Sequence, residues 1–225
     1  MNRRIVNLQL FCLGLSMVAG TVIAESDDVR LPNPVGLTPC NADDPVTQVV
    51  KRAAASLGAE ALGCFRSKET TEIQGTDGAA VVPRERAFAS RMPGGPYSSA
   101  DLDSLLAKVR NQWKSFDPLS KAHREDYVAR INALVEASSG ERGSVKSISP
   151  LLVSIEPVNS RFYVVVSIRQ YVGQRSGSTK VDGLAMALQD GRLLRLEIQR
   201  ELTATADVDD VRRQIGAWAS AVTSN

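Results

Sequence analysis

The chain of 225 residues is poor in the side chains that most enzymes and metal proteins use. It has one histidine, His123, three cysteines and only 5% aromatic residues. A single histidine excludes the His-Glu-x-x-His zinc motif, and the glycines form neither a Walker loop nor a Gly-x-Ser-x-Gly elbow. His123 itself is either a general base or an exposed helix residue, and its isolation favours the second interpretation. We therefore predict no catalytic residue, no cofactor and no metal ligand.

Net charge is also lacking once the N-terminus is set aside. Two arginines are the only charged residues among the first 24, so the rest of the chain carries 25 basic and 25 acidic residues. Nucleic acids and anionic membranes attract proteins through an excess of positive charge. The balanced charge therefore disfavours a nucleic acid as partner and any general attraction to a membrane surface.

Residues 1–24 have the parts of a secretory signal peptide. Two arginines precede an apolar stretch at 11–23, and the small-residue sequence at 22–24 suits cleavage. The alternative is an uncleaved membrane anchor, because residues 5–24 are about as long as a spanning helix needs to be. We expect cleavage and a periplasmic or secreted protein, which would touch a membrane only through this segment if it is uncleaved.

Removal of the signal peptide leaves two cysteines, Cys40 and Cys64. An even number of cysteines in an exported protein predicts a disulfide, whereas a reducing compartment would leave two free thiols. Closing this loop would stabilise the fold by about 3.5 kcal/mol in the chain-entropy model. We predict the disulfide.

Residues 25–95 are predicted to form an extended tail, one helix and a loop-rich segment. The helix begins after Asp44, which can cap it, because Pro45 suits the first helical position. Gly58 is a suitable stop.

The sequence after this helix gives a weaker pattern. Residues 59–65 are expected to add a short helical turn that brings Cys64 back towards Cys40. Between 67 and 95 we predict a loop-rich link, because glycine and proline interrupt it repeatedly. Within it, a turn separates two possible short strands, 70–74 and 79–82.

Residues 96–225 are predicted to form an α+β domain that begins with a helical hairpin. Ser98 and Asp101 resemble a capping box at the start of its first helix. The buried face of this helix is predicted to contain Leu102, Leu105, Leu106, Val109 and Trp113. A second helix is expected to begin at Asp117-Pro118, with an apolar stripe formed by Tyr127, Val128, Ile131, Leu134 and Val135.

The rest of this domain alternates with period 2, which indicates antiparallel strands. We predict four of them in a meander, at 147–158, 161–172, 180–189 and 192–201. Asn159-Ser160 and Asp190-Gly191 are the expected hairpin turns. In the first strand, one face is predicted to carry Leu151, Val153 and Ile155.

An amphipathic helix from about Asp207 closes the chain, and its apolar stripe comprises Val208, Val211, Ile215, Trp218 and Val222. The predicted fold is therefore α+β, with N-terminal helices and a helical hairpin packed on a sheet of four or more strands. This order of elements, with an aromatic residue in the last helix, is similar to the Mog1/PsbP-like fold over residues 147–222. The resemblance implies a non-enzymatic assembly or partner-binding protein.

Acidic side chains suggest two alternatives. Asp207, Asp209 and Asp210 could bind a cation, although acids at a helix N-terminus are also stabilised by the helix dipole. Glu125 and Asp126 could supply one half of a carboxylate pair for glycoside hydrolysis, but the sequence identifies no second half.

The outward side of the second strand mixes aromatic and basic residues, which are typical of protein contact sites. Tyr163, Arg169 and Tyr171 are the candidate partner-binding residues. This face is either covered by the helical hairpin, which would make the tyrosines core residues, or free to bind.

The sequence thus favours an exported, non-catalytic accessory or assembly protein that binds a protein partner in the cell envelope. The alternatives are a hydrolase of envelope polymer that uses carboxylates, and a protein that binds a small ligand or an ion.

Overall fold

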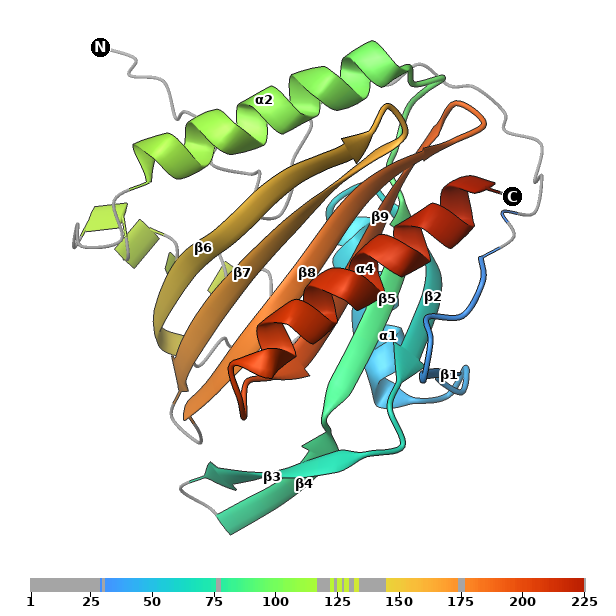
Figure 1. Cartoon of the computed structure of the whole chain (residues 1–225). Helices are drawn as coiled ribbons and strands as arrows, with labels where there is room; N and C mark the ends of the chain where they lie inside the picture. Colours follow the sequence, from blue (N-terminus) through green and yellow to red (C-terminus); the bar gives the residue numbers. More distant parts are fainter. Residues whose placement is uncertain are drawn as a thin grey trace.

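The protein is built around a seven-stranded antiparallel sheet (Figure 1). The computed structural model describes residues 29, 31–75, 78–116, 122–123, 125–126, 128–129, 132–133, 145–173 and 177–224. The strands of this sheet are β1 (Thr38–Pro39), β2 (Glu60–Arg66), β5 (Glu85–Arg91), β6 (Val145–Asn159), β7 (Phe162–Gly173), β8 (Gly177–Gln189) and β9 (Arg192–Glu201). Their spatial order is β1-β2-β5-β9-β8-β7-β6.

Helices lie on both faces of the sheet. They are α1 (Pro45–Ser56), α2 (Ser99–Ser115) and α4 (Ala206–Ser224). Figure 1 shows α4, in red, across one face and α2, in green, on the other side. Among the described residues, none of the helices combines the length and apolar character that crossing a bilayer requires.

The predicted meander is confirmed by β6 to β9, which pair in sequence order. Asp190 and Gly191 connect β8 to β9, and both have positive φ, at 48° and 73°. Two residues with left-handed backbone conformation suit the twist of a hairpin with a two-residue turn. At the other predicted turn, the Asn159 side chain accepts hydrogen bonds from the backbone N–H of Arg161 and Phe162.

The predicted stripe of α4 packs on one face of the sheet, as expected. Val211, Ile215 and Val222 are fully buried, and Trp218 is 3% exposed. They contact a buried set from the central strands that includes Phe162, Val164, Val166, Val181, Ala185, Leu194, Leu196 and Ile198. The helix lies very close at Gly183, where a Cβ would be 2.8 Å from Val211 Cγ1.

The other face of the sheet is covered by α2. The predicted capping box is confirmed: the Ser98 side chain and the Asp101 backbone form one half, and the Asp101 side chain and the Ser98 backbone form the other. The buried residues of α2 pack with Ala54 of α1 and with a set from the sheet that includes Tyr163, Val165, Met186 and Leu193. The central strands are therefore apolar on both sides.

Two segments differ from the prediction in the N-terminal half. Residues 59–65 do not form a helical turn, because 60–66 is strand β2. Residues 85–91, expected in a loop-rich link, form β5, which pairs with β9. Residues on both sides of the predicted boundary at 95 thus share one sheet. The two short strands were predicted correctly and form a separate hairpin of β3 (Thr70–Gly75) and β4 (Gly78–Pro83).

Strand β6 also corrects the prediction. Leu151 and Val153 were assigned to a buried face, but they are 59% and 37% exposed. The strand lies at the edge of the sheet, and a register shift between Leu152 and Ser154 changes which side chains face α2. Most of the predicted second helix of the hairpin lies outside the described residues, Tyr127, Ile131, Leu134 and Val135 included.

Candidate functional site

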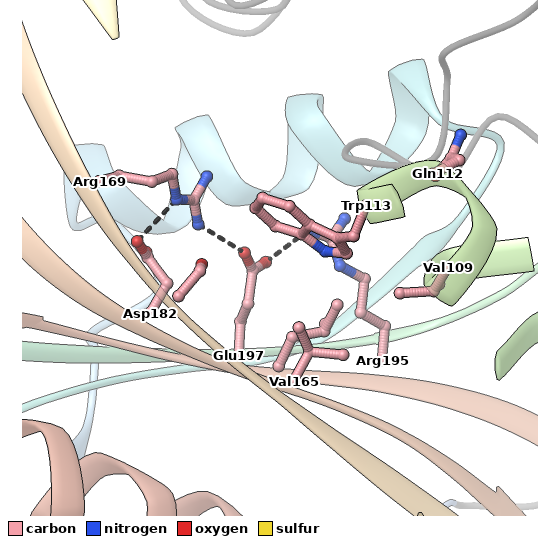
Figure 2. Close-up of a pocket in the computed structure, with 10 residues that line it drawn as sticks. Val109, Gln112, Trp113, Val165, Arg169, Asp182, Arg195 and Glu197 are labelled. Carbon is pink, nitrogen blue, oxygen red and sulfur yellow. Dashed lines mark hydrogen bonds and ion pairs between the residues drawn. The ribbon is translucent and has the colours of Figure 1, made fainter. Parts of the chain in front are cut away.

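Charged side chains from three neighbouring strands meet beneath the C-terminal half of α2 (Figure 2). They are Arg169 of β7, Asp182 of β8, and Arg195 and Glu197 of β9, which we call the Arg169 cluster. Gln112 and Trp113 of α2 line the same small cavity. This is the part of the α2 face where the apolar core gives way to ionised groups.

The cluster is a chain of alternating charges. Arg169 Nε donates to Asp182 Oδ2 at 2.6 Å, and Arg169 Nη2 lies 3.9 Å from Glu197 Oε1. Glu197 Oε2 in turn lies 2.9 Å from Arg195 Nη2. Two cations and two anions balance one another, and Arg169 is held from two sides by carboxylates.

The sheet register places these groups together. Ser167 of β7 pairs with Asp182, and two residues further along β7, Arg169 lies on the same face. Leu184 pairs with Glu197, so the two-residue period puts Glu197 on that face as well. Side chains on one face of adjacent strands are close enough to interact, which explains how residues far apart in sequence form ion pairs.

Asp182 is the most unusual member of the cluster. It is 3% exposed, and its Oδ1 atom has no hydrogen-bond partner among the described residues. Burial raises the pKa of Asp182, and the attraction of Arg169 offsets this only in part. The adjoining cavity measures about 30 Å³, which is enough for a water molecule and too small for an ordinary ligand.

The structure separates the three predicted partner-binding residues. Tyr163 is 1% exposed beneath α2, and burial raises its pKa well above the usual value. It is a core residue, which is the outcome expected where a helix covers this face. Arg169 lies at the end of that cover with 13% of its side chain exposed. The side chain of Tyr171 lies outside the described residues.

The sequence analysis did not identify Asp182, Arg195 and Glu197 as neighbours of Arg169, nor the position of Trp113 beside them. The alternation of β9 did place Arg195 and Glu197 on the outward side. Combining that pattern with the hairpin register would have put them near Arg169. No pattern in the sequence indicated that α2 would bury them.

The predicted acidic cluster at the start of α4 is engaged with arginines. Asp207 contacts Arg84 at 2.8 Å, and Asp209 and Asp210 pair with basic residues of α4 and β9, namely Arg212, Arg213 and Arg200. Burial would raise the pKa of Asp207, but hydrogen bonds from Thr203 and Ala204 outweigh it and lower that pKa. Within the described ranges, no group of three or more His, Cys, Asp or Glu residues is placed to hold a metal ion.

The remaining candidates are His123, Glu125 and Asp126. His123 stacks on Phe116, which in turn contacts Trp113 edge to face, with ring centroids 6.0 Å apart in both pairs. Glu125 and Asp126 are exposed.

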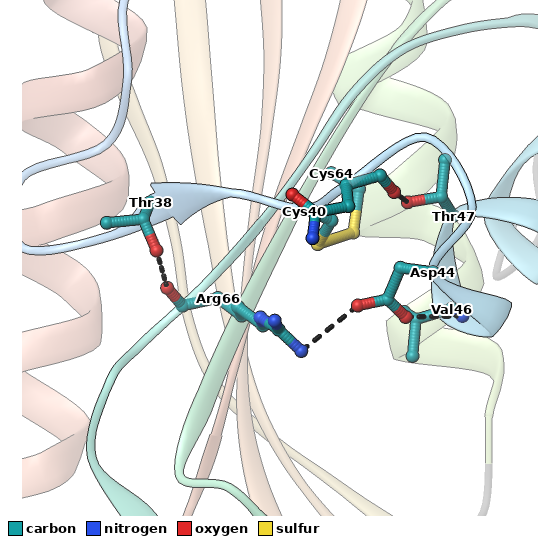
Figure 3. The surroundings of a disulfide bond; sticks show 8 residues. Thr38, Cys40, Asp44, Val46, Thr47, Cys64 and Arg66 are labelled. Atoms are coloured by element: carbon teal, nitrogen blue, oxygen red, sulfur yellow. Dashed lines mark hydrogen bonds and ion pairs between the residues drawn. A yellow bond between two sulfur atoms is a disulfide. The ribbon is translucent and has the colours of Figure 1, made fainter.

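The predicted disulfide between Cys40 and Cys64 is present (Figure 3). It joins the chain before α1 to β2, and Arg66 and Asp44 add an ion pair of 3.0 Å beside it. Asp44 also caps α1 by accepting a hydrogen bond from the Val46 N–H at 2.9 Å. A cavity of about 380 Å³ adjoins the disulfide.

No family model and no curated protein matches the chain.

Proposed function

We propose that this chain is an exported, non-catalytic accessory or assembly protein that binds a protein partner in the periplasm or outside the cell. The partner contacts the surface formed by Gln112, Trp113 and Arg169, at the end of the α2 face. We also propose that the sheet and its C-terminal helix have a Mog1/PsbP-like arrangement.

One observation carries this proposal: Trp113 and Arg169 line the same cavity. Tryptophan and arginine are two of the three residue types that most often dominate binding energy at protein interfaces. Asp182 and Glu197 hold the Arg169 side chain in place, so little conformational freedom remains to be lost on binding.

The same cluster contains two carboxylates, Asp182 and Glu197, which a hydrolase would need. Each is paired with an arginine at 2.9 Å or less, and the cavity beside them has room for about one water. This geometry supports binding at the rim rather than hydrolysis of a polymer inside the cavity.

Affinity capture from envelope extract tests the proposal. Trp113→Ala should reduce capture of a specific protein by roughly tenfold or more, because large aromatic contacts at interfaces contribute well over 1 kcal/mol. Arg213→Ala is the matched control, since this arginine lies on α4 with 75% of its side chain exposed. Equal capture by wild type and Trp113→Ala would place the binding surface elsewhere.

A further inference from the structure

Three features coincide at Asp182 that set it apart from Glu197, the other acid of the Arg169 cluster. Its carboxylate is almost fully buried, Oδ1 has no hydrogen-bond partner in the described part of the chain, and Oδ2 accepts a hydrogen bond of 2.6 Å from Arg169 Nε. Glu197, by comparison, is 17% exposed and lies between two arginines. Loss of charge at Asp182 would therefore act mainly on Arg169.

We propose that uptake of a proton by Asp182 releases Arg169 and thereby makes binding at the Trp113 and Arg169 surface dependent on pH. The partner would bind when Asp182 is ionised and dissociate when Asp182 is protonated. This regulation rests on the proposed function, because it concerns the same surface.

The charged groups around Asp182 determine the response. Arg169 of β7 and Lys180 of β8 favour its ionised form, and Glu197 of β9 opposes it. Over this cluster α2 places Val109, Gln112 and Trp113, none of which is charged. Protonation would leave two arginines and one carboxylate in the cluster, so its balanced charge becomes net positive.

Movement of the Arg169 side chain can relieve this excess positive charge. Arg169 already has its Nη2 atom 3.9 Å from Glu197 and part of its side chain in solvent. Without the Asp182 charge, its guanidinium can turn towards Glu197 or towards water, because a buried cation without a partner is unfavourable. Either movement changes the rim of the cavity next to Trp113.

The direction of the Asp182 pKa shift indicates that protonation of this group acts locally and does not promote acid unfolding. Burial raises the pKa of Asp182, so the folded protein takes up this proton more readily than the unfolded chain does. Lowering the pH through the folded-state pKa therefore relieves a cost of burial, and this group does not favour unfolding as it titrates.

Nuclear magnetic resonance of the mature protein tests the switch without a partner. The ¹³C shift of the Asp182 carboxyl should titrate with a midpoint above about 3.9, the ordinary aspartate value. The Trp113 indole N–H should shift with the same midpoint. Trp218 lies on the opposite face of the sheet and should not follow it, which provides an internal control.

Phe116 contacts the rings of both His123 and Trp113, so a variant at His123 serves as a control. In His123→Gln the Asp182-linked shift of Trp113 should persist, and in Asp182→Asn it should disappear. A Trp113 titration that survives Asp182→Asn, or a carboxyl that titrates at or below about 3.9, would overturn the switch. The wild-type carboxyl signal decides this even if Asp182→Asn folds poorly.

Binding separates this inference from the proposed function. With the captured protein as probe, affinity should fall at least about tenfold as Asp182 takes up its proton. Binding that requires Trp113 but stays constant across this titration would refute the switch and leave the proposed function standing. Binding that ignores Trp113 at every pH would refute the proposed function, while the resonance titration would still report on the switch.

Discussion

The ion pair between Arg169 and Asp182 gives the sharpest energetic prediction. Replacing Arg169 by alanine leaves the Asp182 carboxylate buried with its nearest cation gone. Breaking a buried pair in this way costs about 3–5 kcal/mol, because the remaining charge keeps its desolvation penalty. Asp182→Ala should cost less, about 1–3 kcal/mol, because Arg169 can still turn to Glu197 or to solvent.

The double variant, Arg169→Ala with Asp182→Ala, should cost no more than Arg169→Ala alone. Once the arginine is absent, removing the carboxylate also removes the uncompensated charge. The two single effects should therefore exceed the double effect by about 2 kcal/mol, within the range found for residues in one ion-pair network. Asp209 and Arg212 offer a matched control pair on the surface of α4, with 64% and 34% of their side chains exposed. Their coupling should stay below about 0.5 kcal/mol.

Urea unfolding of the wild type, the single variants and the double variant at neutral pH measures both couplings. A coupling at Arg169 and Asp182 no larger than that of the surface pair would show that solvent screens the cluster. In that case Asp182 is not buried as described. The claims that carboxylates hold the Arg169 side chain in place and that Asp182 makes binding depend on pH would both lose their support.

Three further predictions concern the scaffold. Trp218→Ala should lower the free energy of unfolding by about 3–5 kcal/mol, because Trp218 is buried against Phe65 and its indole N–H donates to a backbone carbonyl. A loss under about 1 kcal/mol would refute that packing. Gly183→Val should also destabilise, since even a Cβ there would lie 2.8 Å from α4, and an unchanged urea midpoint would contradict so close a helix. Asp207 has a lowered pKa, so the stabilisation it provides is present above the ordinary aspartate pKa and is lost as the pH falls through the folded-state pKa. Asp207→Asn should weaken this loss of stability at acid pH, and an unchanged pH profile of the free energy of unfolding would argue against the hydrogen bonds to Asp207.

The sequence predicted the C-terminal half of the fold well because local patterns determine it. The alternation of β7 and the Asp190-Gly191 turn specify hairpins between neighbouring segments, and the stripe of α4 specifies which side of the helix is buried. Capping residues likewise located the start of α2. Each of these features depends on residues close together in the chain.

Non-local pairing explains the strands that were missed. Strand β5 is stabilised by β9, more than 100 residues away in sequence, and its mixed charged and small residues resemble a loop. In β6, periodicity could not reveal the register shift after Leu152, so the buried face was assigned wrongly.

The candidate site was only partly predictable for the same reason. Arg169 was identified, because it stands on an outward face with aromatic neighbours. Asp182 and Glu197 have the alternation of ordinary solvent-facing residues. Only the position of α2 shows that they are covered, and no local pattern specifies which part of a sheet a helix will cover.

Site-specific photo-crosslinking in cells tests the central claim most directly. A benzophenone side chain at Gln112, beside Trp113 and Arg169, should form an adduct with a discrete envelope protein, and the adduct should disappear when Trp113→Ala is added. The same group at Arg213, on the opposite face of the sheet, should not form that adduct. An identical adduct from both positions, or no adduct from Gln112 in a correctly folded and exported protein, would contradict partner binding at this surface.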